Sequence, residues 1–147
     1  VLLDKKSPFL RSVVINKGSK DNIKLGMSVL DGNYLVGKVV EVNYLSSRIL
    51  LLSDLNSKIP IIVEPGGIHS ILSGSGKDYG IIQYTKEDYT IDHNSIIYTS
   101  GSGGIFKAGV PIGTVKIQSN NEKKVQFYSD FSQLEFVKII SYMKDSN

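Results

Sequence analysis

The stretch Thr99-Ser-Gly-Ser-Gly-Gly-Ile-Phe-Lys-Ala-Gly-Val-Pro-Ile-Gly-Thr-Val115 decides how this chain folds. Gly101, Gly103 and Gly104 carry no Cβ, so the backbone can take a positive φ there without a clash. Pro111 has a fixed φ and no N–H donor, which suits the first residue of a strand. After Pro111, small or apolar residues alternate with polar ones, as in a half-buried strand. The stretch therefore predicts a strand, a wide glycine loop and a second strand.

An earlier segment of the chain follows the same plan. Aligning the two places Gly26 opposite Asn94 and Gly37 opposite Gly113. Asn is the non-glycine residue most at ease in a left-handed conformation. Gly37 lies 11 residues after Gly26, and Gly113 lies 19 residues after Asn94, so the later copy has eight extra residues, which form the glycine-rich loop. We predict an internal duplication, to which chance similarity of two β-hairpins is the alternative.

The whole chain reads as short β-strands. About eleven runs of β-forming residues are separated by turn residues, and no segment shows ten residues with helical apolar spacing. This pattern predicts an all-β fold of two small six-stranded β-barrels in tandem. The sharpest break is Glu64–Gly67, so the first barrel is placed at 1–64 and the second, with the glycine loop, at 65–131. Each would be marginal alone, so we expect the two to share packing.

Composition excludes several classes of function. The 147 residues are 41% hydrophobic and 21% charged, which is typical of globular proteins. Without cysteine there is no disulfide and no thiolate metal site, and the two histidines lie far apart, so no metal or cofactor is expected. Lysines are scattered and the arginines are only Arg11 and Arg48, which argues against nucleic acid as a partner. No apolar run is long enough to cross a bilayer, so this fragment is not expected to span one.

The segment around Ser102 also resembles the nucleophile loop of trypsin-like proteases, which are double β-barrels. A serine nucleophile needs a histidine base and a carboxylate to orient that base. His69 and His93 lie 33 and 9 residues before Ser102, and neither spacing reaches from one barrel to the other. A serine hydrolase is therefore an alternative that the spacing disfavours, and no catalytic residue is assigned. An oligonucleotide-binding barrel is a further alternative, and it requires a basic groove with stacked aromatics.

Three stretches together resemble the MreC family of bacterial rod-shape-determining proteins. They are Ile15–Ser19, Ser47–Pro60 and the Thr-Ser-Gly-x-Gly-Gly-Ile-Phe loop, which is the most specific of the three. The resemblance covers about residues 11–140. Lys107 stands where the family usually has Pro, and Asn94 where it usually has Gly, which puts local loop geometry in doubt.

The resemblance implies an architecture and a function. The last strand, within 132–147, should return to the first barrel. The chain should be the periplasmic domain of a single-pass inner-membrane protein of a bacterium, whose cytoplasmic start, membrane helix and coiled coil precede it. Its implied role is a non-enzymatic scaffold that organises peptidoglycan synthases of the cell-elongation machinery and maintains rod shape. Implied partners are a second copy, the penicillin-binding transpeptidase of elongation and, through the full-length protein, MreD, RodA and the actin-like MreB.

The glycine loop is the candidate site for assembly or partner binding. In one hypothesis Ile105 and Phe106 are exposed and form an apolar anchor of the kind that concentrates binding energy. In the other, Phe106 fills the core of the second barrel. The edges of small sheets can also recruit strands from partners. The predicted binding or assembly residues are Gly101, Ser102, Gly103, Gly104, Ile105 and Phe106, and the predicted structural residues are Gly26, Gly37, Pro111 and Gly113.

Overall fold

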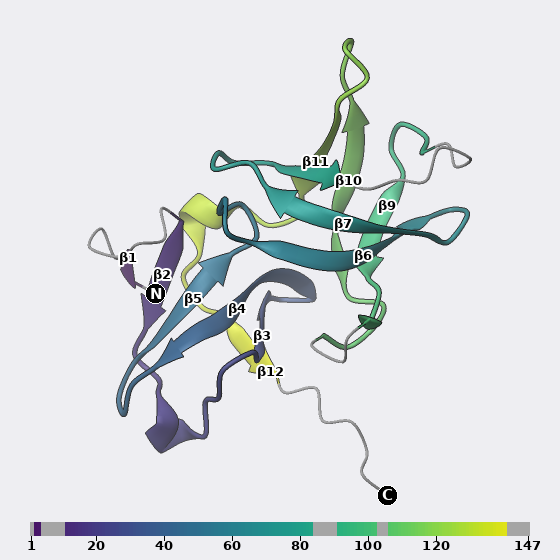
Figure 1. Ribbon diagram of the computed structural model, residues 1–147. Helices are drawn as coiled ribbons and strands as arrows, with labels where there is room; N and C mark the ends of the chain where they lie inside the picture. The colour runs from purple at the N-terminus through teal and green to yellow at the C-terminus, as the bar shows by residue number, and fades with distance from the viewer. Residues whose placement is uncertain (1, 4–10, 84–90, 103–105, 141–147) are drawn as a thin grey trace, which may run out of the picture.

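The computed structural model describes residues 2–3, 11–83, 91–102 and 106–140 as an all-β structure, as predicted (Figure 1). In this part of the chain no helix is long and apolar enough to cross a membrane. The elements are β1 (Leu2–Leu3), β2 (Ser12–Ile15), η1 (Ser19–Asp21), β3 (Ser28–Asp31), β4 (Tyr34–Val42), β5 (Ser47–Leu51), β6 (Lys58–Glu64), β7 (Ile68–Gly74), β8 (Gly80–Gln83), β9 (Ile96–Thr99), β10 (Pro111–Ile117), β11 (Lys123–Phe127), η3 (Phe131–Gln133) and β12 (Lys138–Ile140).

The strands form two six-stranded units. One is a closed barrel in the order β10-β11-β8-β7-β6-β9, and the other is a sheet in the order β1-β2-β5-β4-β3-β12. The last strand pairs with β3, which confirms its predicted return to the first unit. The two predicted six-stranded units are thus one closed barrel and one sheet that is not closed between β1 and β12 within the described residues. In the closed barrel the corresponding seam joins two consecutive strands of one hairpin, β6 and β7.

The boundary between the units also differs from the expected one. Strand β6 pairs with β7 and β9, so it belongs to the closed barrel, and the chain changes unit between β5 and β6. The segment read as a domain boundary is instead the turn of the β6–β7 hairpin. Gly66 and Gly67 take φ values of 107° and 63° there. A glycine-rich turn between two strands of one sheet uses the same residue types as a linker between domains. The Pro-Gly-Gly sequence after Glu64 therefore could not distinguish the two, and the expected boundary was wrong.

The internal duplication is visible in backbone geometry. Gly26 and Asn94 both have positive φ, 85° and 71°. The Gly26 N–H donates to the Val39 carbonyl and the Asn94 N–H to the Val115 carbonyl, each at 2.8 Å. The meander β3–β4–β5 therefore corresponds to β9–β10–β11, and the alignment made from the sequence is confirmed.

The two strand glycines, Gly37 and Gly113, are also equivalent. In each copy the pairing register shifts directly before the glycine, which marks a β-bulge. A Cβ at Gly37 would lie 2.2 Å from the Leu50 carbonyl oxygen, and one at Gly113 would lie 2.2 Å from that of Gln126. Each glycine thus lets a bent strand approach its neighbour more closely than any side chain allows.

The two units share packing, as expected for units of this size. The core of the closed barrel includes Leu30, Leu35 and Leu52, which come from the first unit and the connection that follows it. Phe131 of η3 packs against the cores of both units, and its ring stacks on Phe127 at 4.6 Å between centroids. Phe131 therefore bridges two apolar cores, one of which contains residues from both units.

Asp54 holds the connection between β5 and β6. Its side chain is fully buried, and one carboxyl oxygen accepts the backbone N–H of Arg11 at 2.6 Å. The other oxygen accepts the backbone N–H of Asn56 at 2.8 Å and its side-chain amide at 3.0 Å. These bonds offset the cost of burying a carboxyl group. They tie the start of β2 to the crossing point between the units.

The end of β7 closes the same junction from the other side. Gly76 donates to the Ser53 carbonyl at 2.8 Å and accepts the Arg11 Nε–H at 3.0 Å. A Cβ at Gly74 would lie 1.9 Å from the Asp54 carbonyl oxygen, so only glycine fits there. The two units are therefore held at a fixed contact by backbone groups as well as by the shared core.

The turn η3 is capped by Asp130. The Ser132 hydroxyl donates to Asp130 Oδ1 at 2.6 Å and the Ser132 backbone N–H at 3.0 Å, and these two bonds lower the pKa of Asp130 below its usual 3.8. A carboxyl whose pKa is lower in the folded chain stabilises it above the unfolded pKa. That contribution is lost as the pH falls through the folded pKa.

We expect Asp130→Ala to lower the melting temperature at neutral pH, because the cap of η3 is lost. The difference from the unchanged chain should shrink as the pH falls well below 3.8, where Asp130 is protonated in both states. Thermal unfolding followed by circular dichroism across this pH range measures it. Gln133→Ala in the same turn is the control, and a pH-independent deficit for Asp130→Ala would contradict the argument.

We expect Gly37→Ala and Gly113→Ala to lower the free energy of unfolding by similar amounts, roughly 1–3 kcal/mol or more, because the new Cβ meets backbone that cannot move aside. Lys58→Ala on an exposed strand position should change it by less than about 0.5 kcal/mol. Denaturant titration of the three variants tests this. Two glycine variants as stable as the control would show that the strands can separate at no cost.

Candidate partner-binding surface

Thr99 closes the base of the glycine loop. Its backbone N–H donates to the Val110 carbonyl and its own carbonyl accepts from the Gly109 N–H, each at 2.9 Å. Its hydroxyl accepts the Val110 N–H at 2.9 Å and donates to the Lys107 carbonyl. Because Thr99 makes all four of these bonds, it joins the end of β9 to the start of β10 and holds the loop at its root.

Inside the loop the described residues serve packing. Gly101 has a φ of 78°, and a Cβ there would lie 2.9 Å from that of Ala108, so the glycine allows the two sides of the loop to touch. Phe106 is only 2% exposed and belongs to the core of the closed barrel. Of the two hypotheses for this residue, the structure thus favours the core. Gly103, Gly104 and Ile105 lie outside the described residues.

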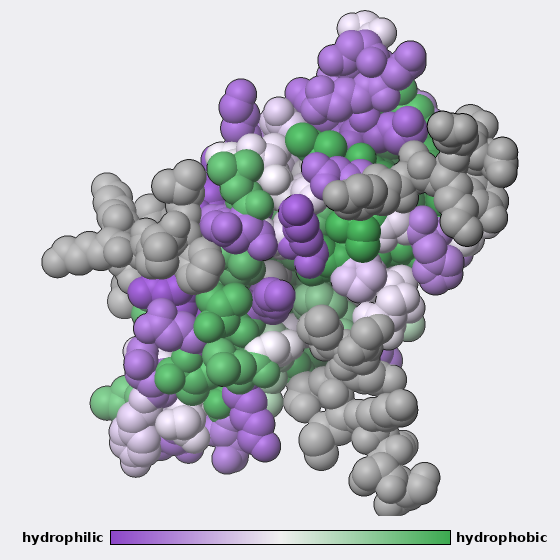
Figure 2. Space-filling view, in the orientation of Figure 1, coloured by the Kyte–Doolittle hydropathy of each residue, from purple (hydrophilic) through white to green (hydrophobic). Residues whose placement is uncertain are grey.

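The outer surface of the barrel beside this loop is partly apolar. Pro60 pairs with Ile71, and Ile62 with Tyr98, in adjacent strands, and all four side chains are half-buried on the outside of the barrel. We call these four residues the β6–β9 face. Figure 2 shows hydrophobic side chains among hydrophilic ones over this part of the molecule. A depression of about 290 Å³ opens here, lined by Pro60, Ile61, His69, Ser70, Ile71, Ser100 and Ser102.

Ser102 and His69 line the same depression, and both belong to the closed barrel or its loop, so the histidine does not come from the other unit as the protease arrangement requires. No carboxylate is among the lining residues, and no hydrogen bond joins Ser102 to His69. The backbone N–H of Ser102 donates instead to the Ser100 hydroxyl at 3.2 Å. His93 accepts the Ile117 backbone N–H at 3.0 Å through Nδ1, in a turn contact. The described residues thus assemble no triad, and they hold no group of three or more potential metal ligands.

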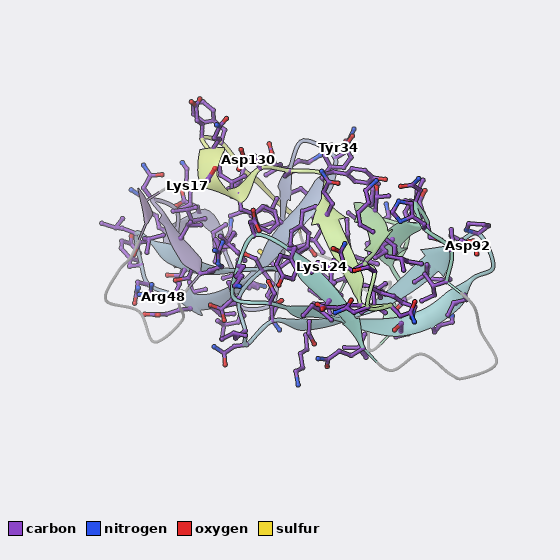
Figure 3. The ribbon with its side chains drawn as sticks, turned by 90° about the horizontal axis from the view of Figure 1, so that it is seen from above. Lys17, Tyr34, Arg48, Asp92, Lys124 and Asp130 are labelled. Carbon is purple, nitrogen blue, oxygen red and sulfur yellow. The ribbon has the colours of Figure 1, made fainter. Side chains whose placement is uncertain are left out.

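A second surface lies where the two units meet. Tyr34, at the start of β4, and Tyr128, just after β11, are each 39% exposed, and their ring centroids are 4.9 Å apart. Phe136 is 86% exposed. It precedes β12, whose Lys138 pairs with Leu30, so Phe136 lies at the same end of the first sheet as Tyr34. Figure 3 shows Tyr34 and Asp130 along one side of the molecule.

We call the contacting pair Tyr34 and Tyr128, together with the exposed Phe136 at the same end of the first sheet, the junction aromatic patch; the ring contact is between the two tyrosines. Local sequence patterns do not reveal it, because its members come from three separate segments. One signal was available: alternation in the last strand places Phe136 on the same face as Lys138 and opposite the inward Val137. Large exposed apolar groups of this kind mark interaction sites in soluble proteins.

The chain matches a known protein family over almost its whole length. The family described as "Rod shape-determining protein MreC, barrel core" matches residues 1–141. A curated relative, the cell shape-determining protein MreC of Cereibacter sphaeroides, is 33% identical over 140 residues. The match covers 95% of this chain and 47% of the relative, so the chain spans about half of that protein's length.

Solved structures share the same fold. The crystal structure of MreC from Pseudomonas aeruginosa matches with a TM-score of 0.85 at 28% identity, covering 96% of this chain and 95% of that one. A chain in the complex between penicillin-binding protein PBP2 and MreC from Helicobacter pylori matches with a TM-score of 0.66 at 16% identity, covering 88% and 82%. At that identity the likeness shows the fold alone.

We expect Phe106→Ala to lower the free energy of unfolding by about 3–5 kcal/mol, the usual loss for a buried phenylalanine. Ser102→Ala, at an exposed position of the same loop, should change it by less than about 0.5 kcal/mol. Urea unfolding of both variants provides the measurement. If the Phe106→Ala chain is as stable as the Ser102→Ala chain, Phe106 is not a core residue, and the hypothesis that it anchors a partner is favoured instead.

Proposed function

Because the chain belongs to the MreC family of rod shape-determining proteins, we propose that it is a periplasmic scaffold domain that organises peptidoglycan synthases during cell elongation. The observation that carries this proposal is the family match, which extends over residues 1–141. The proposal includes placement in a single-pass inner-membrane protein and no catalytic step.

Two surfaces suit a scaffold. The junction aromatic patch combines side chains from both units, and the β6–β9 face presents apolar side chains from one barrel. Aromatic residues are over-represented among those that dominate binding energy. Phe136, with most of its ring in solvent, is the strongest single candidate for such a contact. We propose the patch as the main partner site and the β6–β9 face as a second one.

The proposed partner is the penicillin-binding transpeptidase of elongation. The Helicobacter pylori relative was solved in complex with PBP2, which supports this class of partner. Self-association, and contacts with MreD, RodA and MreB through the full-length protein, belong to the same proposal. The two units are joined by shared core residues and by the bond from Arg11 to Asp54. A surface that includes residues from both units would therefore keep the same shape when it meets a partner.

We expect Phe136→Ser to weaken binding of the transpeptidase's periplasmic domain by roughly tenfold or more, as for a residue at the centre of an interface. Tyr44→Ser is the matched control, because Tyr44 is 66% exposed but follows the opposite end of β4 from Tyr34. Binding is measured on immobilised transpeptidase, with each variant's melting temperature recorded. Restoration of rod shape in cells lacking their own MreC is the second readout.

Two results would count against this assignment. If Ile71→Asp weakens binding while Phe136→Ser does not, the β6–β9 face is the main site and the patch is not. If the unchanged chain restores rod shape without binding the transpeptidase, the partner class is wrong although the scaffold role stands.

A further inference from the structure

A depression of about 540 Å³ lies where the two units meet, away from the β6–β9 face. In Figure 1 the η3 turn, on one side of it, lies between the start of β2 and the loop that joins β7 to β8. A volume of this size is typical of sites that hold small molecules. The residues that line it and decide what it can accept are Arg11, Asp78, Phe127, Asp130, Phe131 and Ser132.

Arg11 presents a fixed cation to this depression. Its backbone N–H donates to the buried Asp54 carboxylate at 2.6 Å, and its side-chain Nε–H donates to the Gly76 carbonyl at 3.0 Å. The two terminal nitrogens of the guanidinium group make no hydrogen bond or ion pair with the described residues. This outer edge can therefore bind a carboxylate through two parallel N–H donors.

Asp78 lines the depression from the loop between β7 and β8. The Ser75 hydroxyl donates to the Tyr79 carbonyl at 2.6 Å and accepts the Lys77 backbone N–H at 3.1 Å, so the loop that carries Asp78 is held by its own hydrogen bonds. Asp78 is exposed, and its carboxylate has no partner among the described residues. It is therefore able to bind a cationic group of a ligand.

The other lining residues add an apolar surface and a second carboxylate. Phe127 and Phe131 are half-buried, and their rings stack with centroids 4.6 Å apart. Asp130 lies next to Phe131, and its Oδ1 accepts the hydroxyl and the backbone N–H of Ser132. The depression thus combines one cation, two carboxylates and two aromatic rings.

The combination favours a short peptide with free ends over other small ligands. A peptide supplies a terminal carboxylate for Arg11, an ammonium group for Asp78 and apolar side chains for the two rings. A phosphate-bearing ligand would bring further negative charge toward two carboxylates, which repel it. An uncharged sugar would leave the charges of the depression without partners.

We propose that the depression at the junction is a binding site for short peptides of about two to four residues, a size that its volume accommodates. The Arg11 guanidinium group binds the terminal carboxylate, and Asp78 together with Asp130 binds the ammonium group. Phe127 and Phe131 contact the apolar side chains. Free peptides and peptides attached to a glycan share this chemistry, and the experiment below separates the two sources.

A bound peptide contacts both units and the segment that connects them. Tyr128 of the junction aromatic patch lies in this segment, between Phe127 and Ser129. Occupancy of the depression therefore holds this part of the patch in one arrangement. That consequence for a partner rests on the proposed scaffold function, whereas peptide binding itself does not.

The test adds trialanine to the isotopically labelled chain and follows the amide chemical shifts by NMR. Peptide is added up to about 10 mM, a range that detects ligands with few contacts. We expect saturable shifts at Arg11, Asp78 and Phe131. Trialanine amide and N-acetyl-trialanine each lack one charged end, and each should bind roughly tenfold more weakly, the usual loss for a hydrogen bond to a charged group.

Variants of the chain assign the two ends of the peptide. Asp78→Asn should weaken trialanine binding by roughly tenfold and leave the binding of N-acetyl-trialanine unchanged, because that peptide has no ammonium group. Asp92→Asn is the matched control, since Asp92 is also exposed and lies far from Asp130 in Figure 3. Arg11→Gln, studied with its melting temperature, tests the carboxylate contact. If that variant fails to fold, trialanine amide tests the same contact from the side of the ligand.

The second probe is the set of disaccharide-peptides that a muramidase releases from peptidoglycan. If they shift the same residues and bind more tightly than trialanine, the site takes glycan-attached peptides; if they bind more weakly, it takes free ones. Two results would overturn the proposal. One is the absence of shifts at the lining residues with both probes. The other is equal binding of trialanine and N-acetyl-trialanine amide, which would show that neither charged end is recognised.

Discussion

The hydrogen bonds of the Asp54 carboxyl group are the interaction on which the arrangement of this protein depends. They occur where the chain leaves one sheet and enters the other, and they bind Arg11, at the start of β2, to that crossing. A buried carboxyl group that lost these partners would be costly, so the crossing has one conformation rather than several. Gly74 approaches the same segment so closely that a Cβ there would lie 1.9 Å from the Asp54 carbonyl oxygen. The shared core and the surface patch at the junction both require this fixed contact.

Two copies of one strand plan give two different units. The bulge glycines and the left-handed residues Gly26 and Asn94 occupy the same places in each copy. Yet one copy forms a closed barrel, whereas the described residues of the other form a sheet whose outer strands, β1 and β12, are not paired with each other. In the barrel the seam is a hairpin, while in the sheet it falls between strands from the two ends of the chain. The same local geometry therefore occurs in a closed barrel and, within the described residues, in a sheet that is not closed.

Two phenylalanines show how function is placed on this scaffold. Phe106, in the most distinctive part of the sequence, is buried and stabilises the barrel, whereas Phe136, in an ordinary strand segment, is almost fully exposed. The sequence predicted a loop between two strands at Thr99–Val115, because glycine and proline restrict or free the dihedral angles of their own backbone. The junction aromatic patch was not predictable, because Tyr34 and Tyr128 meet only when the two units pack.

The sequence by itself determined the all-β class, the duplication and the positions that need a positive φ or a missing Cβ. These are local demands, set by the dihedral angles and the bulk of single residues. Only the tertiary structure decided that β6 belongs to the closed barrel, that Phe106 faces inward and that β12 pairs with β3. Strand partners and burial depend on segments distant along the chain, and a period of two shows that a strand has two faces without showing what will cover each.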